Sequence, residues 1–210
     1  MEISHKTQAA LQFLVPTVII YSIFGAYLLN GEWPTLSFLQ EKSAGLAILG
    51  IGAMLVQDLI PKPIKEFLVF LRMKNRMPGH RAFSPESMKD PNIDWQNIPN
   101  QVEFSTAPPA TQQQQFYKLY RSVSDNRSVN HYSQRYIAWR DLSVVLVILC
   151  IVSVPILATF DSTRAMPTGF ILAGGSFFAY LLTSFAARNV ANGLVVQVLS
   201  LIATGSKLNG

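Results

Sequence analysis

Basic and aromatic side chains alternate in two stretches of the middle of the chain, and these are the residues best suited to chemistry. Guanidinium and ammonium groups neutralise phosphate, and flat aromatic rings accept stacked bases. The pattern therefore predicts a site for an anionic ligand. Its candidate residues are Arg76, His80, Arg81, Tyr117, Lys118, Tyr120 and Arg121.

A membrane surface is the alternative partner for such residues. A basic helix beside a bilayer binds anionic lipid heads with about 1 kcal/mol per cation, and Tyr and Trp beside a membrane helix commonly mark the interface. We favour this interpretation for Lys62, Lys65, Trp139 and Arg140, which lie closest to the apolar runs described below. For the candidate ligand site, both interpretations stay open.

Familiar catalytic and metal-binding motifs do not occur in the sequence. It has no Walker loop, no zinc-binding Cys/His spacing, no nucleophile elbow and no HExxH. The histidines His5, His80 and His131 are far apart and lack regularly placed carboxylates. The single cysteine, Cys150, provides neither an intrachain disulfide nor a thiolate cluster. We therefore expect no enzyme activity, no metal and no cofactor.

Small side chains recur every four residues near the end of the chain. Such a stripe allows helices to approach closely in lipid, where packing drives association. One interpretation is an oligomer whose stripe lines or seals a pore; the other is packing within the chain against the glycine-rich residues 43–60. The stripe consists of Gly175, Ala179, Thr183, Ala187 and Ala191.

A separate apolar stripe follows in the last residues. It predicts a short cytoplasmic bundle between subunits. Its members are Val190, Leu194, Val198 and Leu201.

The elements that position these residues include four apolar runs. The chain of 210 residues is 50% hydrophobic and only 14% charged, whereas soluble domains carry about 25% charged residues. About 20 helical residues at 1.5 Å each cross a hydrocarbon core of about 30 Å. The second run is marginal, and we take it as spanning because an even number of crossings agrees with the charges. The runs are residues 9–29, 43–60, 142–160 and 168–187.

The distribution of Lys and Arg sets the orientation, because positive residues stay on the cytoplasmic side. Residues 61–141 hold twelve of the 17 basic residues, while the loops at 30–43 and 161–169 hold only Lys42 and Arg164. Both termini and residues 61–141 are therefore expected in the cytoplasm. The twelve are Lys62, Lys65, Arg72, Lys74, Arg76, Arg81, Lys89, Lys118, Arg121, Arg127, Arg135 and Arg140.

We accordingly predict an all-α membrane protein with four transmembrane helices and a small, mostly helical, basic cytoplasmic domain between helices 2 and 3. The boundaries are 1–60 for the first helix pair, 61–141 for the cytoplasmic domain, 142–187 for the second pair and 188–210 for a cytoplasmic C-terminal helix.

Local signals divide the cytoplasmic domain further. An amphipathic helix is expected from Lys62 to the Pro78-Gly79 pair. A turn-rich stretch with one short strand at residues 102–105 should follow. Two more helices are expected, over about 109–123 and 126–140, and the second is expected to continue into the third apolar run.

This layout resembles the membrane effectors of bacterial anti-phage defence systems, most of all that of the Hailong system, with the CBASS and Pycsar effectors behind it. The resemblance covers the architecture of the whole chain, with the basic stretch Lys74-Asn75-Arg76-Met77-Pro78-Gly79-His80-Arg81. It implies a tetrameric ion channel in the inner membrane, held shut by a DNA oligomer that a partner nucleotidyltransferase makes.

The leading hypothesis is an oligomeric membrane channel or membrane-disrupting effector, gated by a nucleotide or oligonucleotide on its cytoplasmic domain. One competing class is a non-conducting membrane scaffold that recruits a soluble partner through the same domain. Another is a small transporter, which the helix discontinuities expected at Pro16 and Pro155 would suit.

Overall fold

The computed structural model describes residues 15–30, 59–84, 87–98, 101–159 and 163–208. Every regular element in these ranges is a helix, so the described part of the chain is all-α, as predicted. The chain divides into two compact units. One comprises Met1–Leu68 and Ile137–Phe185, and the other comprises Val69–Tyr136 and Ala186–Gly210.

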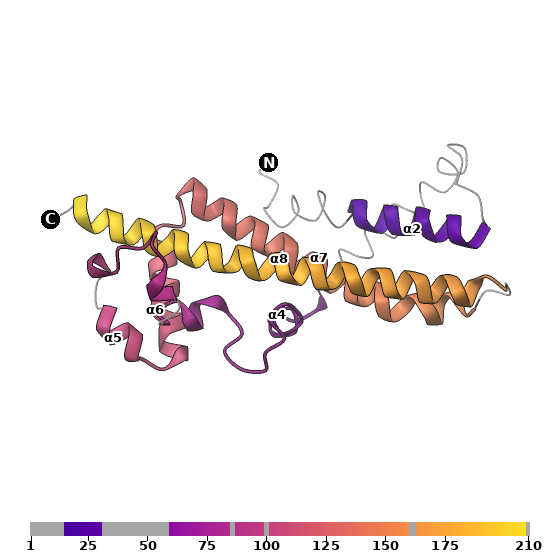
Figure 1. Ribbon diagram of the computed structural model, residues 1–210, viewed down its shortest axis with the longest axis horizontal. Helices are drawn as coiled ribbons and strands as arrows, with labels where there is room; N and C mark the ends of the chain where they lie inside the picture. Colours follow the sequence, from indigo (N-terminus) through magenta and orange to yellow (C-terminus); the bar gives the residue numbers. More distant parts are fainter. Residues whose placement is uncertain (1–14, 31–58, 85–86, 99–100, 160–162, 209–210) are drawn as a thin grey trace. The chain divides into compact units, whose positions relative to one another are not determined.

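Two long antiparallel helices dominate the first unit (Figure 1). They are α7 (Arg127–Leu157) and α8 (Ala165–Leu208), of which residues 137–157 and 165–185 belong here. The hydroxyl of Ser143 donates to Oγ1 of Thr183 at 3.1 Å. A Cβ on Gly169 would lie only 3.1 Å from the Cα of Val154. The two helices therefore contact each other closely at two well-separated levels.

Both helices are long and apolar enough to cross a membrane. In α8, only 28% of the most apolar 18-residue window is buried within the chain. A soluble protein rarely exposes an apolar surface of this kind, so lipid contact suits α8 better than water. Its exposed side chains include Phe170, Ile171, Phe177, Phe178, Leu181, Leu182 and Phe185.

Of the first two predicted crossings, one is described in most of its length and the other lies largely outside the described residues. The first, residues 9–29, is described from residue 15 on as α2 (Val15–Asn30), in which Tyr21 shares a hydrogen bond with Ser153 of α7. The second, residues 43–60, is described only at its last two positions. The structure thus contains two of the four predicted spans as candidate membrane helices.

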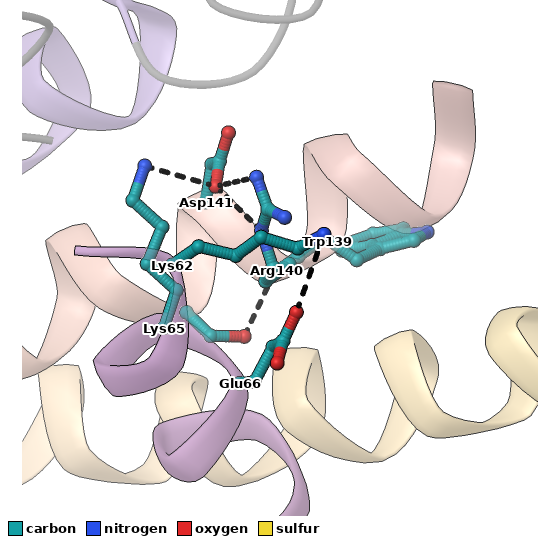
Figure 2. A network of polar contacts seen from close by, with 7 residues as sticks. Lys62, Lys65, Glu66, Trp139, Arg140 and Asp141 are labelled. Atoms are coloured by element: carbon teal, nitrogen blue, oxygen red, sulfur yellow. Dashed lines mark hydrogen bonds and ion pairs between the residues drawn. The ribbon is translucent and has the colours of Figure 1, made fainter. Parts of the chain in front are cut away.

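A buried ion network joins α4 (Lys62–Phe70) to α7 (Figure 2). Asp141 accepts from Nζ of Lys65 at 3.4 Å and from Nε and Nη2 of Arg140, each at 2.9 Å. All three residues are buried. The prediction that Lys65 and Arg140 face lipid heads is therefore wrong, because both cations pair with the buried Asp141.

In the residues described, the second unit contains five short helices and the remaining parts of the long ones. Residues 127–136 of α7 and 186–208 of α8 belong to it. The helices expected over 109–123 and from 126 into the third run are confirmed by α6 and α7. The short helices are η2 (Pro78–Arg81), η3 (Ser87–Lys89), η4 (Trp95–Asn97), α5 (Gln101–Thr106) and α6 (Pro109–Ser122).

Two local predictions are wrong. The expected strand at residues 102–105 is the helix α5, because a strand needs a neighbouring strand and none occurs among the described residues. The amphipathic helix ends at Phe70 rather than at Pro78-Gly79. Leu71 follows with a φ of 51°, in the left-handed region that terminates helices.

The core of the second unit contains the apolar stripe at the end of α8. Leu194 and Val198 are buried there with Phe83, Phe116 and other apolar residues of the same unit, and Leu201 packs against them. This stripe was predicted to form a bundle between subunits. The structure instead buries it within the chain, because the central segment provides the apolar surface that it covers.

Candidate anion-binding site

A cavity of about 360 Å³ opens within the second unit, and arginine side chains dominate its polar wall. Four arginines and one aspartate line it, together with hydroxyl, amide and apolar groups. A cavity of this size accommodates a small ligand. Its residues are Phe70, Arg72, Arg76, Met77, Pro78, Arg81, Ser84, Ser87, Asp90, Arg188, Asn192, Val195 and Val196.

The end of α4 places two of the arginines. Because Leu71 turns the backbone sharply at φ 51°, Arg72 and Arg76 lie in an irregular segment instead of a continuing helix. Asn75 also has a φ of 51°, which asparagine tolerates better than most residues. Nε of Arg76 donates to the carbonyl of Met73 at 3.1 Å, a local bond that orients its guanidinium.

Helix η2 carries Arg81 and packs directly on α6. A Cβ on Gly79 would lie 2.7 Å from Cδ1 of Phe116, so only glycine allows this approach without a shift. Phe116 is buried. The contact with α6 therefore fixes the helix whose residues Pro78 and Arg81 line the cavity.

One face of α8 contributes a further set of lining residues. Arg188, Asn192 and Val195 follow at helical spacing. Nε of Arg188 donates to the carbonyl of Val69 at 2.6 Å. That carbonyl is among the last four of α4, which have no acceptor role inside their own helix.

Polar groups on the remaining wall are held by local hydrogen bonds. The hydroxyl of Ser87 donates to the carbonyl of Arg81 at 3.0 Å and shares a hydrogen bond with Ser84. Oδ1 of Asp90 accepts from the backbone N–H of Asn92 at 2.9 Å. Asp90 provides one negative charge against four positive ones, so the cavity favours an anion.

The structure separates the predicted ligand residues into two groups. Arg76 and Arg81 line the cavity. The others do not: His80 bonds through Nδ1 to the carbonyl of Met77 at 3.2 Å, next to the cavity wall.

The remaining candidates lie on α6. The rings of Tyr117 and Tyr120 stack with centroids 6.2 Å apart, and the guanidinium of Arg121 lies 5.6 Å from the centre of the Tyr117 ring. Lys118 is exposed beside them. This basic and aromatic face is therefore a separate surface, outside the cavity lining.

Sequence reasoning missed two of the cavity arginines as ligand residues. Arg72 belongs to the basic stretch that contains Arg76, so its position in the sequence could have included it. Arg188 was assigned only to the predicted cytoplasmic C-terminal helix, residues 188–210. Its spacing of four residues from Asn192 was a weak signal that both share one helical face.

The small-residue stripe of α8 changes its environment along the helix. Thr183 is buried and bonded to Ser143 of α7, and Ala187 and Ala191 are fully buried. Ala179 is half-buried, whereas Gly175 is exposed with no described atom near its missing Cβ. Most of the described stripe is thus occupied by packing within the chain; the glycine-rich residues 43–60 lie outside the described part.

Metal-binding clusters of three or more His, Cys, Asp or Glu residues do not occur among the residues that the structure describes. Comparison with known proteins finds no match to a family model, to a curated protein or to a solved structure. The geometry of the cavity and of the two long helices is therefore the basis for a function.

Proposed function

We propose that the protein is a ligand-gated membrane effector, an oligomeric ion channel whose arginine-lined cavity binds a phosphate-bearing nucleotide or oligonucleotide. The proposed arrangement has four membrane crossings, with both termini and residues 61–141 in the cytoplasm of a bacterial cell. A partner nucleotidyltransferase would supply the ligand, in a role in anti-phage defence.

The observation that carries this proposal is the continuity of α8. Its earlier residues belong to a candidate membrane span, and Arg188, Asn192 and Val195 of the same helix line the cavity. A ligand held by these residues acts directly on a helix that also contacts lipid. Binding shifts a channel between states only if the ligand has different affinities for them.

The composition of the cavity supports a ligand with phosphate groups. Arginine presents a planar fork that matches phosphate oxygens, and it keeps its charge at all physiological pH values. The apolar wall, which includes Phe70, Pro78 and Val196, gives the non-ionic part of a nucleotide a surface to contact.

The proposed oligomer uses the exposed surface of α8. Gly175 and the large apolar side chains around it are available for contact with a second subunit or with lipid. Close helix contact at small residues is the usual mode of association in a bilayer.

Ligand binding to the purified full chain in detergent tests the cavity. We expect saturable binding of pyrophosphate, ATP or oligothymidylate. Arg72→Gln, Arg76→Gln and Arg81→Gln should each weaken it by roughly tenfold, because a hydrogen bond to a charged group contributes about 1.5–3 kcal/mol. Lys118→Gln, on the separate face of α6, is the matched control and should bind as the wild type does.

Ion flux from liposomes tests the channel. We expect the reconstituted protein to pass ions and the flux to change when the ligand is added to the side facing residues 69–136. Flux from vesicles that contain anionic lipids, measured without added ligand, shows whether a lipid phosphate alone alters the channel. Flux that no phosphate compound alters would refute gating, and the absence of any flux would favour a non-conducting scaffold.

A further inference from the structure

The cavity arginines differ in their contacts, and backbone carbonyls anchor Arg76 and Arg188. Nε of Arg76 donates to the carbonyl of Met73 at 3.1 Å, and Nε of Arg188 donates to the carbonyl of Val69 at 2.6 Å. Arg81 is exposed, and no bond from its guanidinium is recorded among the described residues.

Anchoring through Nε fixes the plane of a guanidinium. The two terminal nitrogens then keep a defined direction, so less rotamer freedom is lost when an anion binds. The two anchored arginines come from different elements, one from the segment after α4 and one from α8. They are therefore two pre-oriented forks that line one cavity.

The end of α4 gives the Arg188 anchor a structural basis. The carbonyl of Val69 is left without an intrahelical donor where α4 stops at Phe70. Leu71 then leaves in the left-handed conformation, which stops the helix from extending and using that carbonyl. Arg188 supplies the missing donor, and its position in the cavity follows from the helix end.

We infer that Arg76 and Arg188 are the specificity-determining residues of the proposed anion site, and that each binds phosphate oxygens through its terminal nitrogens while Nε stays on the backbone. The site accordingly selects ligands that carry at least two phosphate groups. Arg81 contributes charge without fixed direction. This inference depends on the anion binding proposed above.

Lysine substitution distinguishes the effect of a fixed guanidinium orientation from the effect of the positive charge. Lys keeps the positive charge but has one nitrogen, which cannot bond a backbone carbonyl and hold a phosphate as a fork at the same time. We expect Arg188→Lys and Arg76→Lys each to weaken pyrophosphate binding by at least tenfold. Arg81→Lys, the matched control, should weaken it by less than about threefold.

Two further measurements on the purified full chain complete the test. The dependence of pyrophosphate affinity on salt should keep the same slope in all three lysine variants, because no charge is lost. Inorganic phosphate should bind the wild type much more weakly than pyrophosphate and should distinguish the variants less. Thermal unfolding identifies a variant that has lost its fold. If Arg188→Lys does not fold, Arg76→Lys still tests the inference, because Arg76 lies in an irregular segment.

The possible results are distinct. Equal losses at positions 76, 81 and 188, or pyrophosphate bound no better than phosphate, would overturn the inference and leave the anion site intact. A wild-type protein that binds neither pyrophosphate nor ATP would overturn both the inference and the proposed function.

Discussion

Asp141 is the counter-charge of two buried cations, a role that its neighbours in the sequence do not indicate. Its carboxylate accepts from Lys65 and Arg140, and the side chains of all three are at most 10% exposed. Removing charges from water is costly, so a buried pair is tolerated only when its partners are well placed. The network ties α4 to α7 at the beginning of the apolar part of α7.

Replacing this carboxylate tests its role. Asp141→Asn should destabilise the protein by about 3 kcal/mol, because two buried cations lose their counter-charge. Thermal or denaturant unfolding of the full chain in detergent measures the change. Lys118→Gln is the control, since Lys118 is exposed on α6 and exposed charges contribute little to stability. Equal stability of both variants would show that the network is dispensable.

At the scale of elements, the contact between η2 and α6 sets the geometry of the cavity. Gly79 lies against Phe116 and Gln113, and the residues on either side of it, Pro78 and His80, are held at that distance. A short helix of four residues has little stability of its own. Its position is therefore determined by packing on α6.

A methyl group at this contact should separate the two elements. Gly79→Ala is expected to lower the melting temperature and to weaken pyrophosphate binding, because Pro78 and Arg81 would shift with η2. Gly205→Ala is the control: no described atom lies within 4 Å of its Cβ position in α8. That change should stabilise the helix by about 0.5–1 kcal/mol. Unchanged melting and binding in Gly79→Ala would contradict this account of η2.

At the scale of the molecule, the membrane assignment depends on two observations. These are the exposed apolar surface of α8 and the distribution of the basic residues. The turn between α7 and α8 and the end of α6 are predicted to face opposite sides of the membrane. Thr163 and Ser122 are exposed at these two places, and Cys150 is the single native cysteine.

Cysteine labelling tests this topology. In a Cys150→Ala background expressed in bacterial cells, an impermeant maleimide should label Thr163→Cys in cells with an intact inner membrane. Ser122→Cys should react only after that membrane is permeabilised. The reverse pattern would invert the proposed orientation, and labelling of both positions without permeabilisation would exclude a spanning α7 and α8.

Composition and local pattern determined much of the architecture by themselves. Long apolar runs identified the membrane-like parts of α7 and α8, and the signals around Pro109 and Asn126 located the later helices. These features depend on residues close together in the chain, so the local sequence is sufficient to predict them. The basic stretch likewise predicted that Arg76 and Arg81 belong to one site, and both line the cavity.

Only the tertiary structure decided which distant residues share a site. Arg188 joins Arg76 in one cavity, Asp141 pairs with Lys65, and the last stripe of α8 turns inward to the core. Helical periodicity indicates which side of a helix is apolar or basic, but it does not identify the surface against which that side packs. That choice depends on how well two faces, far apart along the chain, fit in shape and charge.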